Sequence, residues 1–308
     1  MALVAAGALA IAQQSGRDLS WAFPVADKVQ PPPAQDNGAP IHIPGSTMSY
    51  TRKQINDLTN PPDWIPDEHA PAPVAVKGEP GRKIQGCGAC HLMSGSGHPG
   101  SADVAGFPAE YTARQMAYFR SEARKGGGPM MAIAKALTPE EDLQAGKYFE
   151  TLKPQVWTKV EEAATVPKTY TDRVRERYLL PGGGTEPIGN RIITVPQDPE
   201  REEARDPHSG FIAYVPPGSI KKGEKLVKTG GSGKTVQCEI CHGPGLKGLG
   251  EVPRIAGLHP IYIARQLYNF KSGASAGKMD ELMKQVVVKL DDDDILNISA
   301  YVAAQAPQ

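Results

Sequence analysis

The chain has 308 residues, 40% of them hydrophobic, and its 34 Lys and Arg balance 34 Asp and Glu. This length accommodates two domains of ordinary size. A net charge of zero argues against a nucleic-acid-binding protein, which would carry a basic excess. The 33 Gly and 29 Pro predict long loops.

The first residues, MALVAAGALAIAQQ, form a short apolar run that ends in Ala10-Ile11-Ala12. This A-x-A pattern is typical of a signal-peptide cleavage site, but a basic n-region is missing, so a truncated signal and a retained apolar anchor both stay open. Neither this run nor any later segment has enough consecutive apolar residues to span a membrane. We therefore expect residues 1–12 to be a signal peptide, followed by an extension over 13–50, and the protein to be exported to the periplasm.

The four cysteines form two C-x-x-C-H motifs, the first with Cys87, Cys90 and His91 and the second with Cys238, Cys241 and His242. This pattern is the attachment signature of c-type haem. Two cysteine sulfurs add to the haem vinyl groups, and the histidine reaches the iron from the same face. We predict two covalent haems c. A thioredoxin-like dithiol and a zinc site built from both pairs are the alternatives, but neither explains why a histidine follows each pair.

The glycine-rich stretch GGSGKT, just before the second motif, looks like the end of a phosphate-binding loop. That loop needs the pattern G-x-x-x-x-G-K-[ST], and Lys228 stands where its first glycine should be. We therefore interpret residues 229–235 as a glycine-rich turn.

An internal repeat extends beyond the two motifs. With Cys87 set against Cys238, the matched residues include Ala105-Gly106 with Ala256-Gly257, Tyr111 with Tyr262, Arg114-Gln115 with Arg265-Gln266 and Phe119 with Phe270. After a two-residue difference in length, Leu137 matches Leu290 and Tyr148 matches Tyr301. The repeat predicts two copies of one domain, over 51–155 and 215–308, joined by an insert over 156–214.

The repeat also nominates the second ligand of each iron. A c-type haem with one histidine often takes a methionine on its other side. Met130 and Met283 each lie seven residues before a matched leucine, whereas Met131 and Met279 have no matched partner. A single methionine would be read as a core residue, but a matched pair favours iron ligation. The remaining histidines, including His98 just after the first motif, are expected to be structural or exposed.

Local patterns predict the helices. PAEYTARQMAYFRSEARKG and PIYIARQLYNFKSG carry apolar residues at helical spacing, and each holds a mid-helix arginine, Arg114 or Arg265. These arginines either pair with haem propionates or are solvated. Thr138-Pro139-Glu140-Glu141 and the acidic run over 291–294 have the pattern of helix N-termini.

With these features the chain resembles the dihaem class I c-type cytochromes, most of all the cytochrome c4 family. The resemblance rests on CGACH, CEICHG, AGFPAEYTARQMAYF, AGLHPIYIARQLYNFKSG and LDDDDILNISAYVAAQ, and it covers roughly 85–155 and 215–308. It implies an all-α fold of two haem domains, His/Met ligation of each iron and action as an electron carrier.

The chain also departs from the cytochrome c4 pattern. PGSIKKGEKLVKTG predicts a helix with Ser219 as its cap, whereas APAPVAVKGEPGRKIQG should stay extended, so the matching helix of the first copy is expected upstream in SYTRKQINDL. The insert has no counterpart in the short cytochrome c4 linker. Its runs GNRIITVPQDPE and SGFIAYVPPGS are too apolar for a disordered tether, and they predict short extended segments packed across both domains.

Charge gives one hint about partners, because residues 215–308 hold 12 Lys and Arg against 9 Asp and Glu. Lys221, Lys222, Lys225, Lys228 and Lys234 would steer an acidic redox partner or form a solvated helix face. The expected function is electron transfer from an exported dehydrogenase towards an oxidase or another cytochrome, as a free carrier or a dehydrogenase subunit. A dihaem peroxidase and a docking subunit are the rival functions.

Overall fold

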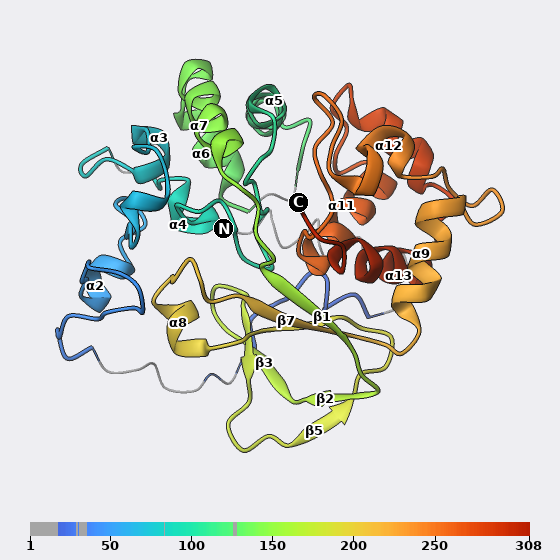
Figure 1. Cartoon of the computed structure of the whole chain (residues 1–308), viewed down its shortest axis with the longest axis horizontal. Coiled ribbons are helices and arrows are strands. Elements are labelled where there is room, and N and C mark those ends of the chain that lie inside the picture. Colours follow the sequence, from blue (N-terminus) through green and yellow to red (C-terminus); the bar gives the residue numbers. More distant parts are fainter. Residues whose placement is uncertain (1–17, 29, 31–35, 83, 126–127) are drawn as a thin grey trace.

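The computed structural model describes residues 18–28, 30, 36–82, 84–125 and 128–308. The predicted signal peptide, residues 1–12, lies outside the described residues. Two helical halves lie side by side above a smaller β layer that the insert builds (Figure 1). No helix within the described residues is both long and apolar enough to cross a membrane.

The first helical half consists of α3 (Val74–Lys77), α4 (Gly88–His91), α5 (Ala109–Arg120), α6 (Met130–Ala136) and α7 (Pro139–Thr151). Helix α5 packs against α6 and α7, and α3 reaches α7. The predicted start of α7 is confirmed, because Thr138 and Glu141 cap each other's backbone N–H groups. Phe119, Leu137 and Phe149 form part of the buried core of this half.

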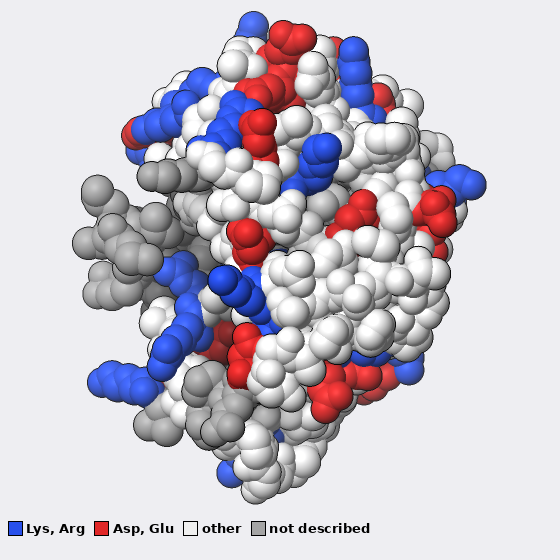
Figure 2. All heavy atoms as spheres, turned by 90° about the vertical axis from the view of Figure 1, so that its left-hand side faces the viewer, with Lys and Arg blue, Asp and Glu red and all other residues white. Residues whose placement is uncertain are grey.

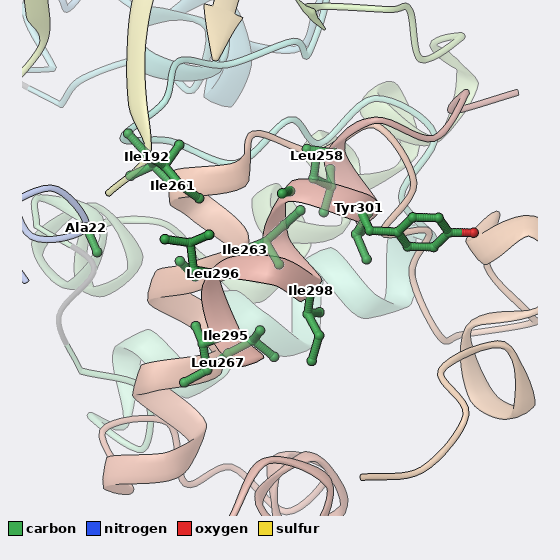
Figure 3. Close-up of a cluster of buried hydrophobic side chains, with 14 of the residues drawn as sticks. Ala22, Ile192, Leu258, Ile261, Ile263, Leu267, Ile295, Leu296, Ile298 and Tyr301 are labelled. Atoms are coloured by element: carbon green, nitrogen blue, oxygen red, sulfur yellow. The ribbon is translucent and has the colours of Figure 1, made fainter. Parts of the chain in front are cut away.

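The second half repeats this order with α9 (Ser219–Thr229), α10 (Glu239–His242), the short 3₁₀ turn η2 (Pro244–Leu246), α11 (Pro260–Ser272), α12 (Asp280–Val287) and α13 (Asp292–Ala303). The apolar faces of α11 and α13 form its core, with Ile263 and Leu267 meeting Ile295 and Ile298 (Figure 3). Helices α9 and α13 cross very closely at Gly223, where an added Cβ would lie 1.9 Å from the Asn297 carbonyl oxygen.

Two predictions about helix starts were wrong. Ser219 does not cap α9, because Gly218 takes the N-cap position with a φ of 81° and Ser219 is already helical. The insert supplies the cap instead, since the Glu162 carboxylate accepts the Ile220 N–H at 2.9 Å. The stretch before the first motif is not wholly extended, because Pro73 fits the N-cap of α3 and Gly78, with a φ of 79°, ends it.

The helix expected further upstream exists but belongs elsewhere. Helix α2 (Arg52–Ile55) starts at a capping box of Thr51 and Gln54, and the 3₁₀ turn η1 (Pro66–Glu68) follows. Ile55 packs with Trp64 and with Ala204 of the insert rather than with the core of the first half. Helix α3 therefore occupies the place in the first half that α9 has in the second.

The insert contains seven strands and one helix: β1 (Thr158–Glu162), β2 (Thr165–Pro167), β3 (Thr169–Thr171), β4 (Arg177–Leu179), β5 (Thr185–Pro187), β6 (Ile193–Pro196), α8 (Pro199–Glu203) and β7 (Phe211–Val215). The main sheet has the order β1–β7–β6, with β7 parallel to β1 and antiparallel to β6. The prediction of an all-α fold therefore holds for the helical halves but not for the whole chain. The extended segments of the insert were predicted, and they contact both halves.

The N-terminal extension is part of the packing. Leu19, Trp21 and Ala22 are buried in the core of the second half, although they lie far from it in the sequence. Ile43 joins the cluster around Trp64. The described residues of the extension thus pack against the second half and against the cluster that includes Ala204 of the insert.

The two halves meet where equivalent residues of the repeat face each other. Asp103 and Arg254 have the same offset from their motifs, and they form a buried ion pair at 2.6 Å. Arg124 and Ser275 are also equivalent, and they form an antiparallel bridge. Equivalent residues that pair in this way imply a local two-fold relation between the halves.

Candidate metal centres

Each C-x-x-C-H motif folds into a single helical turn. The His91 N–H donates to the Cys87 carbonyl at 2.9 Å, and the His242 N–H donates to the Cys238 carbonyl at 2.9 Å. One turn of helix therefore gathers two sulfurs and one imidazole on a short stretch of chain. This is the donor set that covalent attachment of haem c requires.

The two histidines are oriented in the same way. Nδ1–H of His91 donates to the Ala102 carbonyl at 2.8 Å, and Nδ1–H of His242 donates to the Pro253 carbonyl at 2.8 Å. A hydrogen bond at Nδ1 fixes the tautomer and leaves Nε2 as the ligating atom. Burial lowers the pKa of both imidazoles, which keeps them in the neutral form that binds a metal.

The cysteines do not have the properties of the two alternative sites. All four are described, and none of them forms a disulfide. Burial raises the pKa of Cys87 to about 12 and that of Cys238 to about 11, whereas a reactive dithiol needs a lowered pKa. Across the described part of the chain, no three or more His, Cys, Asp or Glu side chains gather as a metal site, so the two pairs do not converge on one zinc ion.

Each matched methionine packs against the hydrophobic core of its own half. Met130, the first residue of α6, packs against the same core as Cys87. Met283, within α12, packs against the same core as Cys238. Met131 shares the packing of Met130, whereas Met279 is 45% exposed and its backbone N–H donates to Tyr118. The Met130 and Met283 ligand roles stay predictions.

Arg114 and Arg265 both reach across the junction between the halves. Arg114 forms an ion pair with Glu251 at 2.7 Å. Arg265 donates to the Pro99 carbonyl at 2.7 Å. Their predicted contacts with haem propionates stay predictions.

The insert covers the first motif and leaves the second open. Leu92, just after His91, is buried and packs against Trp157 and Phe211. Arg205 donates to the Ala89 carbonyl inside the first motif. In the second motif, Ile240 is 61% exposed. The sequence analysis predicted neither contact between the insert and the first motif. One signal was visible, because a leucine follows the first motif where a glycine follows the second.

Two further histidines serve the packing of the insert. Nδ1 of His98 lies 3.4 Å from a carboxylate oxygen of Glu202. His259 is buried, its Nδ1 lies 2.8 Å from the Thr158 hydroxyl, and burial lowers its pKa to about 3. Both side chains thus make packing contacts with the insert, and the expectation that they are structural stays a prediction.

Comparison with known proteins gives the family. No family model matches the chain. Over 83 residues it is 36% identical to cytochrome c-554(547) of Halothiobacillus neapolitanus, which covers 91% of that protein and 23% of this chain. The chain belongs to the c-type cytochromes. The recognition made from the two motifs is confirmed.

Longer matches cover a larger share of this cytochrome. It is 27% identical to the thiosulfate dehydrogenase electron acceptor of Thiomonas intermedia, over 71% of this chain and 78% of that protein. It is 29% identical to cytochrome c4 of Stutzerimonas stutzeri, over 41% of this chain and 71% of that protein. Among solved structures, thiosulfate dehydrogenase (TsdBA) from Marichromatium purpuratum aligns with a TM-score of 0.52 at 24% identity, over 76% of this chain and 39% of that one, which shows a shared fold.

Proposed function

We propose that this cytochrome is a periplasmic dihaem electron carrier that takes electrons from an exported dehydrogenase and passes them to an oxidase or another cytochrome. One observation carries the proposal. Each C-x-x-C-H histidine donates its Nδ1–H to the equivalent backbone carbonyl, Ala102 or Pro253, so that both Nε2 atoms are free to ligate iron in the same way. Two sites prepared identically support two haems.

When bound, haem c supplies an iron that gains and loses one electron. The chain's own residues hold and insulate it. In this proposal Cys87 and Cys90 anchor one haem and His91 and Met130 ligate its iron. Cys238, Cys241, His242 and Met283 do the same in the second half. The protein then fixes ligands, excludes water and sets two potentials, without a substrate of its own.

The relatives suggest the class of electron donor. The match with a thiosulfate dehydrogenase electron acceptor covers 71% of this chain and 78% of that protein. We therefore propose a dehydrogenase that oxidises an inorganic sulfur compound as the first donor to test. The chain would act as the electron-accepting partner and leave substrate chemistry to the dehydrogenase.

The lysines of α9 give this partner a place to dock. Lys221, Lys222 and Lys225 are exposed. Lys228 instead pairs with Glu224 at 2.7 Å, and Lys234 with Asp294 at 2.7 Å. On the face that holds α2, α3 and α8, acidic and basic side chains are interspersed (Figure 2). An acidic partner would therefore favour the α9 side, near the exposed second motif.

A ligand-binding experiment separates the carrier from the dihaem peroxidase. Two six-coordinate irons leave no position for an external ligand, so the reduced protein should bind little carbon monoxide at neutral pH and should not turn over peroxide. It should still exchange electrons rapidly with small mediators. Stoichiometric carbon monoxide binding to one haem, together with peroxide turnover, would favour the peroxidase.

A further inference from the structure

A buried ion pair joins the two helical halves. Asp103 is 1% exposed and Arg254 is 3% exposed, and Nη2 of the arginine lies 2.6 Å from Oδ1 of the aspartate. The two residues occupy equivalent positions in the repeat, each sixteen residues after the first cysteine of its motif. A buried ion pair resists separation, because either charge alone would be buried without a partner. The pair therefore ties one point of the first half to the equivalent point of the second.

Each member of the pair directly follows a residue whose carbonyl orients a motif histidine. Nδ1–H of His91 donates at 2.8 Å to the carbonyl of Ala102, the residue before the aspartate. Nδ1–H of His242 donates at 2.8 Å to the carbonyl of Pro253, the residue before the arginine. A carbonyl and the Cα of the next residue lie in one rigid peptide plane. One ion pair therefore holds both carbonyl acceptors in place.

The guanidinium is anchored by both halves. Its Nε donates to the Ala105 carbonyl at 3.0 Å, and its Nη1 donates to the Ala256 carbonyl at 2.9 Å. These two alanines are equivalent in the repeat. Oδ1 of the aspartate also accepts the Ala105 N–H at 3.2 Å, and the guanidinium lies 5.5 Å from the centre of the Phe107 ring. The pair thus cannot follow a movement of one half without pulling on the other.

We propose that Asp103 and Arg254 are positioning residues that fix the iron-binding histidines of both haems through a single contact. The inference rests on the proposed function, because it needs a haem iron on each histidine. A carbonyl that accepts from Nδ1–H makes the imidazole a stronger donor to iron, and a stronger donor favours ferric over ferrous iron. When the pair is broken, both carbonyls are held less firmly, both imidazoles donate less to iron, and both reduction potentials rise.

The test is potentiometry of the haem-loaded double variant Asp103→Asn with Arg254→Gln, which removes both charges together. Both midpoint potentials should rise. A tenfold weaker preference for ferric iron, the lower end of the effect expected when a ligand loses its hydrogen-bond partner, corresponds to about 59 mV for a one-electron couple. Burial raises the pKa of Asp103 to about 6, so titrations at about pH 8 compare the variant with the ionised pair.

The direction of the two shifts separates positioning from electrostatics. The two charges cancel, so their joint loss removes only a dipole. The local two-fold relation exchanges the two charged positions, so the field of this dipole has opposite signs at equivalent points of the two halves. Loss of charge alone would therefore raise one potential and lower the other, whereas loss of positioning raises both.

A matched control breaks a different ion pair with a buried carboxylate. Arg120→Gln with Asp142→Asn removes the pair between α5 and α7, which lies within the first half and adjoins neither carbonyl. This control should leave the potential of the second haem unchanged.

The wild-type protein offers a second measurement that needs no variant. In NMR spectra of the reduced protein, the Nδ1 protons of His91 and His242 should exchange with deuterium together, because opening of the one ion pair frees both carbonyls.

The outcomes separate the two proposals. A wild-type protein that carries fewer than two haems would refute the proposed function. A two-haem protein in which the double variant shifts the potentials in opposite directions, or shifts only one or neither, would refute the positioning pair alone. Exchange of one Nδ1 proton well before the other would also refute it, as would a rise of both potentials in the control.

Discussion

Leu92 offers the sharpest test of how the insert is joined to the first motif. Its backbone has φ 59° and ψ 164°, whereas the equivalent Gly243 has φ 75° and ψ 169°. This region is almost confined to glycine and costs another residue about 1–3 kcal/mol. The leucine side chain offsets that cost because it is 4% exposed and packs between Trp157 and Phe211.

The magnitudes follow from comparing two variants. Leu92→Ala loses the buried side chain, which costs about 2–5 kcal/mol, and it keeps the backbone strain. Leu92→Gly loses the same packing but relieves the backbone strain. The greater freedom of glycine in the unfolded chain reduces this gain in stability by about 0.4–1 kcal/mol. Leu92→Gly should therefore be more stable than Leu92→Ala by about 1 kcal/mol, which reverses the usual order of these residues.

Urea unfolding of the haem-loaded protein measures the difference, with Trp157 as a fluorescent reporter of the insert. Gly243→Ala in the second half is the converse control, because it adds strain and a clash of its Cβ with the Gly248 carbonyl at 2.3 Å, without any packing to gain. If Leu92→Ala proves as stable as Leu92→Gly, or more so, the strain at Leu92 is not real and the leucine holds the insert by packing alone.

Four further predictions address the sites and the packing. Met283→Ala should abolish the methionine-to-iron absorption band of one ferric haem and lower its potential, whereas the exposed Met279→Ala should not; the opposite result would place the ligand one turn away. Gly223→Ala should destabilise the second half by at least about 1–3 kcal/mol in thermal unfolding, because its Cβ would meet the Asn297 carbonyl at 1.9 Å, and Lys222→Ala is the neutral control. His259 has a pKa of about 3 in the folded protein, below its unfolded value of about 6.5, so the unfolded state takes up the proton first as pH falls. Stability should therefore drop by about 2 kcal/mol between pH 7 and pH 5, and an unchanged slope in His259→Gln would assign the drop to other groups. The rate of reduction by an acidic partner should fall with salt, and fall less in a variant with Lys221, Lys222 and Lys225 changed to Gln; an equal salt dependence would remove α9 as the docking site.

The parts of the structure that were predicted correctly are encoded locally. The C-x-x-C-H spacing fits one helical turn, and the capping pairs at Thr138 and Asp291 need only residues three positions apart. Because the domain is duplicated, each local pattern occurs twice, and the second occurrence supports the prediction made from the first. This is why the helix order of the two halves could be read without any structure.

The parts that were missed depend on residues distant in sequence. Ser219 has the composition of a cap, but Glu162 of the insert takes that role. The Arg205 contact with Ala89 joins positions more than one hundred residues apart, and no local pattern announces it. The strands of the insert were expected as extended segments, but their pairing order depends on tertiary packing against both halves.

The central claim is that this chain carries two covalently bound haems, one on each C-x-x-C-H motif. Intact mass spectrometry after acid–acetone extraction tests it most directly, because thioether-linked haem survives that treatment and any non-covalent haem or zinc is removed. We predict a mass equal to the polypeptide plus two haems, with all four thiols blocked to alkylation. A mass with one haem or none, or free thiols at either motif, would contradict the account.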